Sequence, residues 1–198
     1  MSWWESVYKH SPPWDIGAPQ PEIVKLVKSN EIKVGRVLDI GCGVGDNSIF
    51  LAKRGFSVTC LDIAQLAIEK GKRKAKEQKI KVNFLVGNAL KLDEYFKKAS
   101  FDIVIDSGLF HTLDDDERSL YAKQIKRVLV RGGSIFMLCF SDKEPGSEGP
   151  RRISRKEIEE TFAGIFVINY IRDTFFASKR HKEGAKAYMV SMTKTEDA

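Results

Sequence analysis

Residues 37–46 constrain the fold of this chain more than any other stretch. They begin with Val-Leu-Asp-Ile, which has the apolar, β-branched character of a buried strand in a parallel sheet. Glycines then alternate at Gly41, Gly43 and Gly45, and a helical pattern resumes at Asn47. A strand, a glycine loop and a helix in this order bring backbone amides and the positive helix end to an anionic group. We therefore expect these glycines to contact a ligand, although a tight turn without a ligand has the same local pattern.

Two acidic residues accompany the glycine loop. Asp39 lies inside the strand, and Asp62 follows a second apolar run at residues 56–61. In nucleotide-binding half-folds, an acid at the end of the second strand accepts hydrogen bonds from ribose hydroxyls. The dinucleotide fingerprint requires G-x-G-x-x-G, but Asp46 occupies the position of its last glycine here. The pattern therefore indicates a nucleoside-containing ligand and argues against a nicotinamide cofactor.

Residues 39–45, Asp-Ile-Gly-Cys-Gly-Val-Gly, resemble motif I of the class I methyltransferases that depend on S-adenosyl-L-methionine (SAM). The resemblance covers most of the chain and implies SAM as cofactor and S-adenosyl-L-homocysteine as product. It implies that the glycine loop approaches the methionine moiety and that Asp62 holds the ribose. By the same resemblance, the further residues expected at the cofactor are Asp39, Asn47, Ile63, Asn88, Ala89, Asp106 and Ser107.

The order of the remaining elements predicts the fold class. Strands are expected near residues 36–40, 57–61, 82–86, 101–105 and 134–140, and helices near 20–29, 46–53, 64–77, 114–129 and 154–162. Gly132 and Gly133 are expected to end the fourth of these helices. Short connections between alternating strands and helices imply a parallel sheet covered on both faces. Two late apolar runs, 165–171 and 187–192, suggest an antiparallel pair. We expect a Rossmann-like methyltransferase fold with a mostly parallel seven-stranded sheet.

Length and composition favour one domain over residues 1–198, with an N-terminal region at 1–30 and a core at 31–198. No apolar run approaches a membrane span, and the N-terminus lacks the pattern of a signal peptide, so a cytoplasmic location is expected. Cys42, Cys60 and Cys139 lack C-x-x-C spacing, and Cys60 and Cys139, which lie in strand-like runs, are expected to be buried thiols. Monomer and homodimer are both left open.

The formal net charge is +6, and lysines and arginines crowd residues 70–81. A basic face of this kind could attract nucleic acid. No aromatic residues interleave with these lysines to stack on bases, so a solvated helix is favoured and a nucleic-acid partner is not expected. His10, His111 and His181 lack the spacing of metal ligands, and no metal site is expected.

The first 19 residues hold every tryptophan of the chain and three of its prolines. This concentration favours a lid over the cofactor or acceptor, although packing on the domain surface is the alternative. Residues 12–17 resemble the entry segment of the thiopurine and thiol methyltransferase branch. That resemblance implies that Trp14 packs near SAM, and Tyr8 is expected on the acceptor side.

Two later segments match the family in part. At residues 87–89 the family often has Gly-Asp-Ala, whose acid accepts from the adenine amino group; here Asn88 offers an amide carbonyl instead. Residues 101–111 resemble motif IV and its loop, but they lack the Asn/Asp-Pro-Pro-aromatic sequence of enzymes that methylate base or amide nitrogens. This departure argues against such acceptors. A turn residue after a strand is the alternative for Asn88.

Ligands gather at the carboxyl ends of strands in an open α/β sheet, so Phe110 and His111 are expected to line the acceptor site. His111 is the candidate general base because an ordinary histidine pKa lies near neutrality, with a wall residue as the alternative. Arg151 and Arg152 follow the fifth strand and could grip an anionic acceptor, unless they are simply solvated.

The sequence thus predicts transfer of the SAM methyl group to a small-molecule acceptor, a thiol or other heteroatom, by in-line displacement. Sulfur, oxygen, nitrogen, selenium and tellurium remain open as the acceptor atom. An RNA-directed methyltransferase and a non-catalytic SAM-binding partner protein are the alternatives.

Overall fold

The computed structural model describes residues 3–195. Its helices are α1 (Trp3–Val7), α2 (Pro21–Lys28), α3 (Asp46–Ala52), α4 (Gln65–Glu77), α5 (Leu92–Tyr95), α6 (Asp115–Val128) and α7 (Arg155–Phe162), with 3₁₀ turns η1 (Ala89–Lys91) and η2 (Phe110–Thr112). Its strands are β1 (Arg36–Ile40), β2 (Ser57–Asp62), β3 (Asn83–Val86), β4 (Phe101–Ser107), β5 (Leu129–Phe140), β6 (Phe166–Ser178) and β7 (His181–Lys194).

The strands form one seven-stranded sheet in the order β3-β2-β1-β4-β5-β7-β6. The first five strands of the chain pair in parallel, whereas β7 runs antiparallel between β5 and β6. Successive strands are added to one side of β1 up to β3, and from β4 onward they are added to its other side. Ligands of open α/β sheets bind at the switch point between two such strands. This mixed sheet with helices on both faces confirms the Rossmann-like class I methyltransferase fold.

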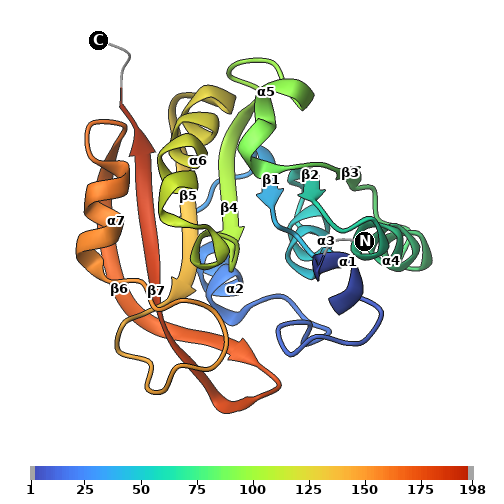
Figure 1. Ribbon diagram of the computed structural model, residues 1–198. Coiled ribbons are helices and arrows are strands. Elements are labelled where there is room, and N and C mark those ends of the chain that lie inside the picture. Colours follow the sequence, from blue (N-terminus) through green and yellow to red (C-terminus); the bar gives the residue numbers. More distant parts are fainter. Residues whose placement is uncertain (1–2, 196–198) are drawn as a thin grey trace.

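Two apolar layers hold the helices to the sheet. One layer joins α5, α6 and α7 to the sheet, with Tyr121, Ile125 and Phe162 fully buried. The other joins α2 and α3 to the opposite face, and α4 extends this cover over β2 and β3. In Figure 1 the arrowheads of β1, β2 and β4 point to the lower side of the molecule, where the N-terminal segment and the turn between β6 and β7 also lie. That side therefore carries the carboxyl ends of the parallel strands.

Most predicted elements are present within one or two residues of their predicted ends. The main exceptions are the start of β5, which lies at Leu129 and not near residue 134, and the ends of β6 and β7; α6 stops at Val128, and Leu129 already pairs with Phe101 in the sheet. The prediction that Gly132 and Gly133 end this helix is therefore wrong. They lie inside β5, beside the register shift between Phe101 and Ile103, and Gly132 has a φ of +70°. A glycine pair marks a β-bulge here, where the sequence pattern suggested a helix end.

Strands β6 and β7 are much longer than the apolar runs that predicted them. They extend over polar residues and form a long hairpin, because pairing with each other satisfies their backbone groups independently of side-chain character. The turn of this hairpin reaches the N-terminal segment, where the amide of Lys179 donates to the carbonyl of Pro13 at 2.8 Å. Segments from the two ends of the chain therefore meet on the side that carries the carboxyl ends of the parallel strands.

Candidate active site

The glycine loop between β1 and α3 has the backbone geometry that its spacing predicts. Gly41, Gly43 and Gly45 have φ values of +65°, +55° and +77°, in the region that side chains disfavour. A Cβ on Gly43 would lie 2.7 Å from the hydroxyl of Tyr8, and one on Gly41 would lie 2.9 Å from Cβ of Leu109. These glycines therefore provide space at the surface of the loop that no other residue would leave free.

Asp39 lies beneath this loop and is almost completely buried. Its Oδ2 accepts a hydrogen bond from the hydroxyl of Ser48 at 2.6 Å, and its Oδ1 has no partner. Burial raises the pKa of Asp39 to about 7, with a smaller contribution from Asp106. A buried carboxylate oxygen without a partner is costly unless a cation or donor reaches it. This atom therefore fits a cationic group such as the ammonium of the SAM methionine moiety.

Ser107 ends β4 next to this position. Its register places it beside Gly41, because Ile40 pairs with Asp106 one residue earlier. The hydroxyl oxygen of Ser107 is buried and, like Oδ1 of Asp39, has no hydrogen-bond partner. Two unpartnered polar atoms and a glycine surface thus lie at the switch point, and they suit the polar end of a SAM molecule.

Asp62 ends β2 and closes the other side of the loop. Its two carboxylate oxygens accept from the amides of Gly43 and Ala64, at 2.8 and 2.9 Å. Burial raises the pKa of Asp62, and these amide hydrogen bonds oppose the rise. Each oxygen keeps a lone pair, so the carboxylate can accept from two ribose hydroxyls while it holds the loop.

Residues after β2 and β3 form an apolar surface next to Asp62. Ile63 and Val86 are 47% and 46% exposed, although both are large aliphatic residues. Asn88 lies beyond them, and its Oδ1 accepts from the amide of Leu90 at 2.8 Å. The backbone amide of Asn88 donates to the hydroxyl of Tyr95 at 3.4 Å. This surface has the composition of an adenine site, with one acceptor lone pair of Asn88 remaining.

Asn47 and Ala89 are less available than the resemblance implied. Oδ1 of Asn47 accepts from the backbone amide of Gln20 at 2.8 Å, so this side chain anchors the segment before α2. The amide group of Gln20 in turn exchanges two 2.9 Å hydrogen bonds with the backbone of Ala177 in β6. Asn47 therefore joins the glycine-loop helix to the N-terminal segment and the hairpin. Ala89 is buried at the start of η1.

Asp106 does not point to an open site. It is fully buried, and it accepts from the amides of Leu109 and Phe110 and from the hydroxyl of Tyr121. Both oxygens of its carboxylate therefore accept from the loop after β4 or from Tyr121. Neither oxygen is free for the predicted contact with the cofactor. Phe110, expected at the acceptor, is fully buried too and packs against the rings of Tyr121 and Phe162. Both residues support the site from within.

His111 lies at the site, but its hydrogen bonding and protonation state do not suit a general base. Its Nδ1 accepts from the backbone amide of Phe140 at 3.0 Å, so the proton of the neutral ring is on Nε2. Burial, with the nearby charge of Arg152, lowers the pKa of His111 to about 3. Because the Nδ1 lone pair is used and Nε2 carries the proton, this geometry supports the alternative that His111 is a wall residue.

Aromatic residues surround His111. Its ring centroid lies 5.1 Å from that of Phe140 and 5.9 Å from that of Phe176, and those two rings are 5.6 Å apart. A Cβ on Gly108 would lie 3.1 Å from the ring of Phe176. Phe140 and Phe176 were missed from the sequence. Phe140 could have been found from its place at the carboxyl end of β5, whereas nothing local marks Phe176.

Arg152 organises the loop between β5 and α7. Its guanidinium donates to the backbone carbonyls of Pro145, Glu148 and Pro150, at 3.1, 2.8 and 2.6 Å, and more weakly to Glu144 at 3.4 Å. A side chain that satisfies four carbonyls of its own loop has few donors left for a ligand. The structure thus does not place Arg152 in the predicted anion grip.

Arg151 points to α6 and α7 instead. Its two terminal nitrogens pair with Asp115 at 2.7 Å and with Glu157 at 2.9 Å, and the side chain is 43% exposed. Glu157 also accepts from Arg118, and this network with Ser154 lowers its pKa to about 2 although burial opposes the shift. The two arginines are therefore separated by their partners, and the structure does not bring them together at the acceptor site.

The N-terminal segment covers the glycine loop. Tyr8 is buried, its hydroxyl lies against Gly43, and Nε1 of Trp14 donates to that hydroxyl at 3.1 Å. Trp14 also packs against the apolar layer that contains Phe140 and Phe176. The amide of Leu66, at the start of α4, donates to the carboxylate of Glu5 at 3.1 Å. Tyr8 thus borders the glycine loop, and Trp14 joins it to the apolar cluster that also contains Phe140 and Phe176.

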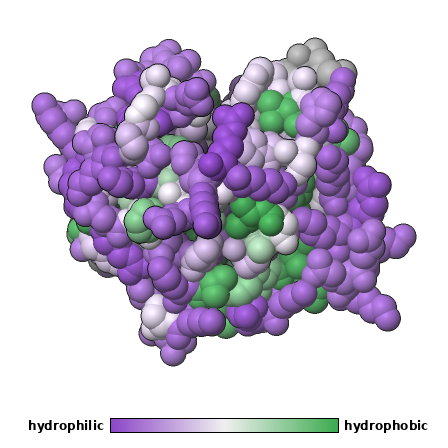
Figure 2. Space-filling model, turned by 90° about the horizontal axis from the view of Figure 1, so that it is seen from below, coloured by the Kyte–Doolittle hydropathy of each residue, from purple (hydrophilic) through white to green (hydrophobic). Residues whose placement is uncertain are grey.

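The face that carries this arrangement is shown from below in Figure 2, where apolar patches lie between hydrophilic side chains. The fold of the chain, together with the glycine loop and the acids of β1 and β2, defines a protein that binds a nucleoside cofactor at a topological switch point. Within residues 3–195, no helix is long and apolar enough to cross a membrane, and no group of three or more His, Cys, Asp or Glu residues forms a metal site.

Comparison with known proteins identifies the class further. Residues 37–133 match the family described as a methyltransferase domain. The chain is 34% identical to a 2-heptyl-1-hydroxyquinolin-4(1H)-one methyltransferase of Mycobacteroides abscessus, over 81% of this chain and 70% of that protein. It is 29% identical to the probable thiol methyltransferase 2 of Arabidopsis thaliana, over 80% of this chain and 70% of that protein. The chain belongs to the class I SAM-dependent methyltransferases.

Solved structures agree with this assignment. A protein from work on the conversion of a disulfide bond into a thioacetal group in echinomycin biosynthesis has a TM-score of 0.86 and 29% identity, with 98% of this chain and 91% of that chain covered. A Burkholderia thailandensis 1,6-didemethyltoxoflavin-N1-methyltransferase with bound S-adenosylhomocysteine has a TM-score of 0.72 and 20% identity, over 89% of this chain and 78% of that chain, and it supports the fold. The protein is an enzyme that transfers the methyl group of SAM to a small molecule.

Proposed function

We propose that this enzyme methylates an oxygen or sulfur atom of a small, mainly apolar acceptor, which reacts as its anion. The observation that carries this proposal is the aromatic wall at the carboxyl ends of β4 and β5. Tyr8, Trp14, His111, Phe140 and Phe176 make up this wall, and we use the name for these five residues. All of these except Trp14 are buried, so an acceptor would be enclosed among them, and flat apolar ring faces of this kind suit a planar acceptor.

The wall offers no evident base among the described residues. His111 holds its proton on Nε2, and Asp106 is committed to its own loop. Burial raises the pKa of Tyr8 far above its ordinary value, so its phenol stays protonated. An acceptor with a hydroxyl or thiol of low pKa needs no base, because a large fraction is ionised near neutral pH. Relatives named for a hydroxyquinolone and for thiols support acceptors of this kind.

The residues of this chain would act on the reaction by placement. Bound SAM supplies a methyl group that its sulfonium already activates, so orientation and exclusion of water contribute most of the rate. We propose that Asp39 and Ser107 hold the methionine end, Asp62 the ribose, and Ile63 with Asn88 the adenine. The aromatic wall would then place the acceptor heteroatom in line with the methyl group.

We propose that residues 3–19 form the lid of this site. Tyr8 lies over Gly43, and Trp14 donates to it and packs against the apolar cluster that contains Phe140 and Phe176. The faces of aromatic rings attract cations, which suits a cover over a sulfonium. The prolines of this segment and the Lys179–Pro13 hydrogen bond hold it beside the hairpin. That the chain is one cytoplasmic domain, and a monomer or homodimer, remains a prediction.

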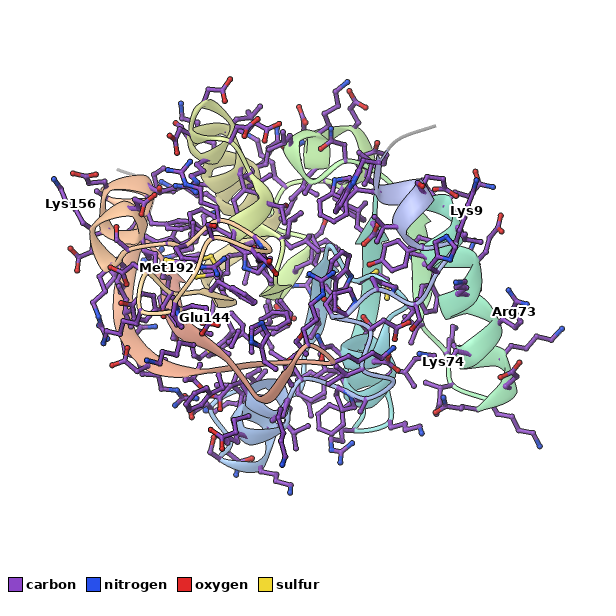
Figure 3. The ribbon with its side chains drawn as sticks, turned by 60° about the horizontal axis from the view of Figure 1, so that its bottom comes forward. Lys9, Arg73, Lys74, Glu144, Lys156 and Met192 are labelled. Carbon is purple, nitrogen blue, oxygen red and sulfur yellow. The ribbon has the colours of Figure 1, made fainter. Side chains whose placement is uncertain are left out.

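RNA is a less favoured acceptor. Two members of the basic run have intramolecular partners, since Lys70 donates to the carbonyl of Tyr8 and Lys74 pairs with Asp46 at 2.8 Å. In Figure 3, Arg73 extends from α4 at the outer edge of the molecule, whereas Lys74 lies on the inner side of this helix. The small-molecule relatives and the lack of stacking residues on α4 both favour a small acceptor.

Transfer of radiolabelled methyl groups from SAM tests the proposal. The acceptor panel would contain hydroxylated heteroaromatic compounds, aryl thiols, matched compounds without an ionisable group, and RNA. We expect turnover with the ionisable hydroxyl or thiol compounds, and a rate that rises with pH through the pKa of each acceptor. Turnover of RNA alone, or equal turnover of the compounds that cannot ionise, would contradict the proposal.

A further inference from the structure

The loop after β4 is fixed by one buried carboxylate. Asp106 is fully buried, and its oxygens accept from the amide of Leu109 at 2.8 Å and from the amide of Phe110 at 3.0 Å. The third donor is the phenol of Tyr121, which is also fully buried in α6. The loop amides come from the chain that follows Asp106, so Tyr121 is the donor that connects this carboxylate to a helix outside the loop.

The same loop contacts both halves of the site. Cβ of Leu109 would lie 2.9 Å from a Cβ on Gly41, so its side chain borders the cofactor loop. His111, two residues later, is held by the amide of Phe140 and belongs to the aromatic wall. A shift of this loop would therefore move the cofactor side and the acceptor side relative to each other. Distances between reacting groups govern methyl transfer strongly, because proximity supplies most of the catalysis.

Tyr121 also affects the charge at this position. Burial raises the pKa of Asp106 to about 6, and the hydrogen bond from Tyr121 is the largest influence that opposes the rise. The other titratable groups that act on this pair are Asp39 of β1 and Cys139 of β5. An ionised Asp39 would disfavour a second negative charge nearby, whereas burial raises the pKa of Cys139 and keeps its thiol neutral. The phenol thus favours the ionised form of Asp106 near neutral pH, in which both oxygens accept from these donors without a carboxyl proton competing for the same positions.

We propose that Tyr121 is a positioning residue for methyl transfer, acting through Asp106 on residues 107–111. It contacts neither the cofactor site nor the aromatic wall directly. This role depends on the site proposed above but not on the identity of the acceptor. It assigns to α6 a part in catalysis that the family motifs do not place there.

The variant Tyr121→Phe tests this role, since it removes one oxygen and keeps the ring that packs against Phe110. We expect hydrogen exchange at the amides of Leu109 and Phe110 to accelerate by about tenfold or more, because their acceptor loses its third donor. The matched control is Tyr170→Phe, which removes a 2.6 Å phenol–carboxylate hydrogen bond to Glu31 far from the site. The control should leave exchange in residues 107–113 as it is in the wild type.

Kinetics supply the second measurement, with whichever acceptor is turned over. In Tyr121→Phe we expect kcat to fall roughly ten- to a hundredfold, with little change in SAM affinity. The pKa of Asp106 should rise without the phenol, so the acidic limb of the kcat profile should move to higher pH. An acceptor that is ionised at every pH, such as thiocyanate, would show the limb that Asp106 causes without a contribution from ionisation of the acceptor.

The outcomes distinguish this inference from the proposed function. If no hydroxyl or thiol compound is methylated but loop exchange accelerates in Tyr121→Phe alone, the proposed acceptor is wrong and the inference stands. Unchanged loop exchange in Tyr121→Phe would overturn the inference. So would equal acceleration in Tyr170→Phe, because the effect would then be a general loss of stability. If Tyr121→Phe fails to fold, the wild type decides: the protection of the Leu109 and Phe110 amides, corrected for the intrinsic pH dependence of exchange, should fall below about pH 6 as Asp106 is protonated, and unchanged protection would overturn the inference.

Discussion

The two sides of this site are built in different ways. On the cofactor side, backbone amides, positive-φ glycines and acids within β1 and β2 form the surface, and most of them lie within 30 residues of one another. On the acceptor side, Tyr8, His111, Phe140 and Phe176 come from four distant segments. A surface made of backbone is restricted to one kind of ligand, whereas a surface made of side chains can change with each substitution. This difference explains how relatives with a common cofactor carry names of different acceptors.

The largest expected effect is a loss of SAM affinity caused by a substitution on the cofactor side. In Gly43→Val, the new side chain meets the hydroxyl of Tyr8 and occupies the space proposed for the methionine moiety, at a backbone φ of +55°. We expect SAM affinity to fall by at least about a hundredfold, measured by calorimetry. Gly132→Val is the matched control, because Gly132 has a φ of +70° but open space around it. Normal SAM binding by the Gly43 variant would show that the cofactor lies elsewhere.

The next effect tests the ribose contact. Asp62→Ala removes the acceptor of two loop amides and of the proposed ribose hydroxyls. We expect SAM binding to weaken by roughly 1–3 kcal/mol, as for unpaired buried polar groups. Asp102→Ala removes a surface carboxylate paired with Arg36 and should bind SAM like the wild type. Equal SAM affinities in the two variants would show that Asp62 does not contact the cofactor.

The success of the sequence-based predictions also differs between the cofactor side and the acceptor side. The positions of the glycine loop, Asp39 and Asp62 in the fold were predictable because they depend on short spacing and on strand ends. The Ser154–Glu157 capping box was predictable for the same reason, and it is present. Local patterns carry such features, because the physical interactions involve neighbours in the chain.

The acceptor side was predicted less well, since its interactions are non-local. Nothing near His111 in the sequence shows that the Phe140 amide occupies Nδ1. Arg152 has the composition of an anion ligand, but loop carbonyls take up its donors. Phe110 lies in the predicted loop, but it begins the 3₁₀ turn η2 and faces the core. Long-range contacts of this kind depend on the folded structure.

A substitution in the lid tests the acceptor side. Trp14→Ala removes one member of the aromatic wall, together with its hydrogen bond to Tyr8 and its packing against the cluster that contains Phe140 and Phe176. We expect kcat/KM for the acceptor to fall by about tenfold and SAM affinity to fall less, because the lid excludes water from the reacting groups. Trp14→Phe should recover part of the activity by restoring the ring. If kcat/KM is unchanged in Trp14→Ala, Trp14 has a packing role only.

The pH dependence of SAM binding gives a smaller effect. The pKa values of Asp39 and Asp106 are raised to about 7 and about 6, so the ligand-free folded state binds more protons than the unfolded chain between about pH 4 and 7. Its stability should therefore decrease as pH rises through this window. A cationic SAM favours ionised Asp39, so SAM affinity should increase severalfold from pH 5.5 to 7.5 and then level off. Calorimetry would show this trend, and an affinity independent of pH would argue against contact with Asp39.

The smallest effect concerns Arg151, whose charge suggested an acceptor clamp. The structure predicts that Arg151→Ala leaves KM for the acceptor within about twofold, because the guanidinium pairs with Asp115 and Glu157 and not with the site. A half-exposed ion pair contributes little, so the unfolding midpoint in urea should also change slightly. Steady-state kinetics with an anionic acceptor is the measurement, and Lys156→Ala on the exposed face of α7 is the control. A KM increase of tenfold or more in Arg151→Ala alone would mean that the loop between β5 and α7 rearranges to bring Arg151 to the acceptor. The acceptor side would then be even more dependent on side-chain arrangement than this structure shows.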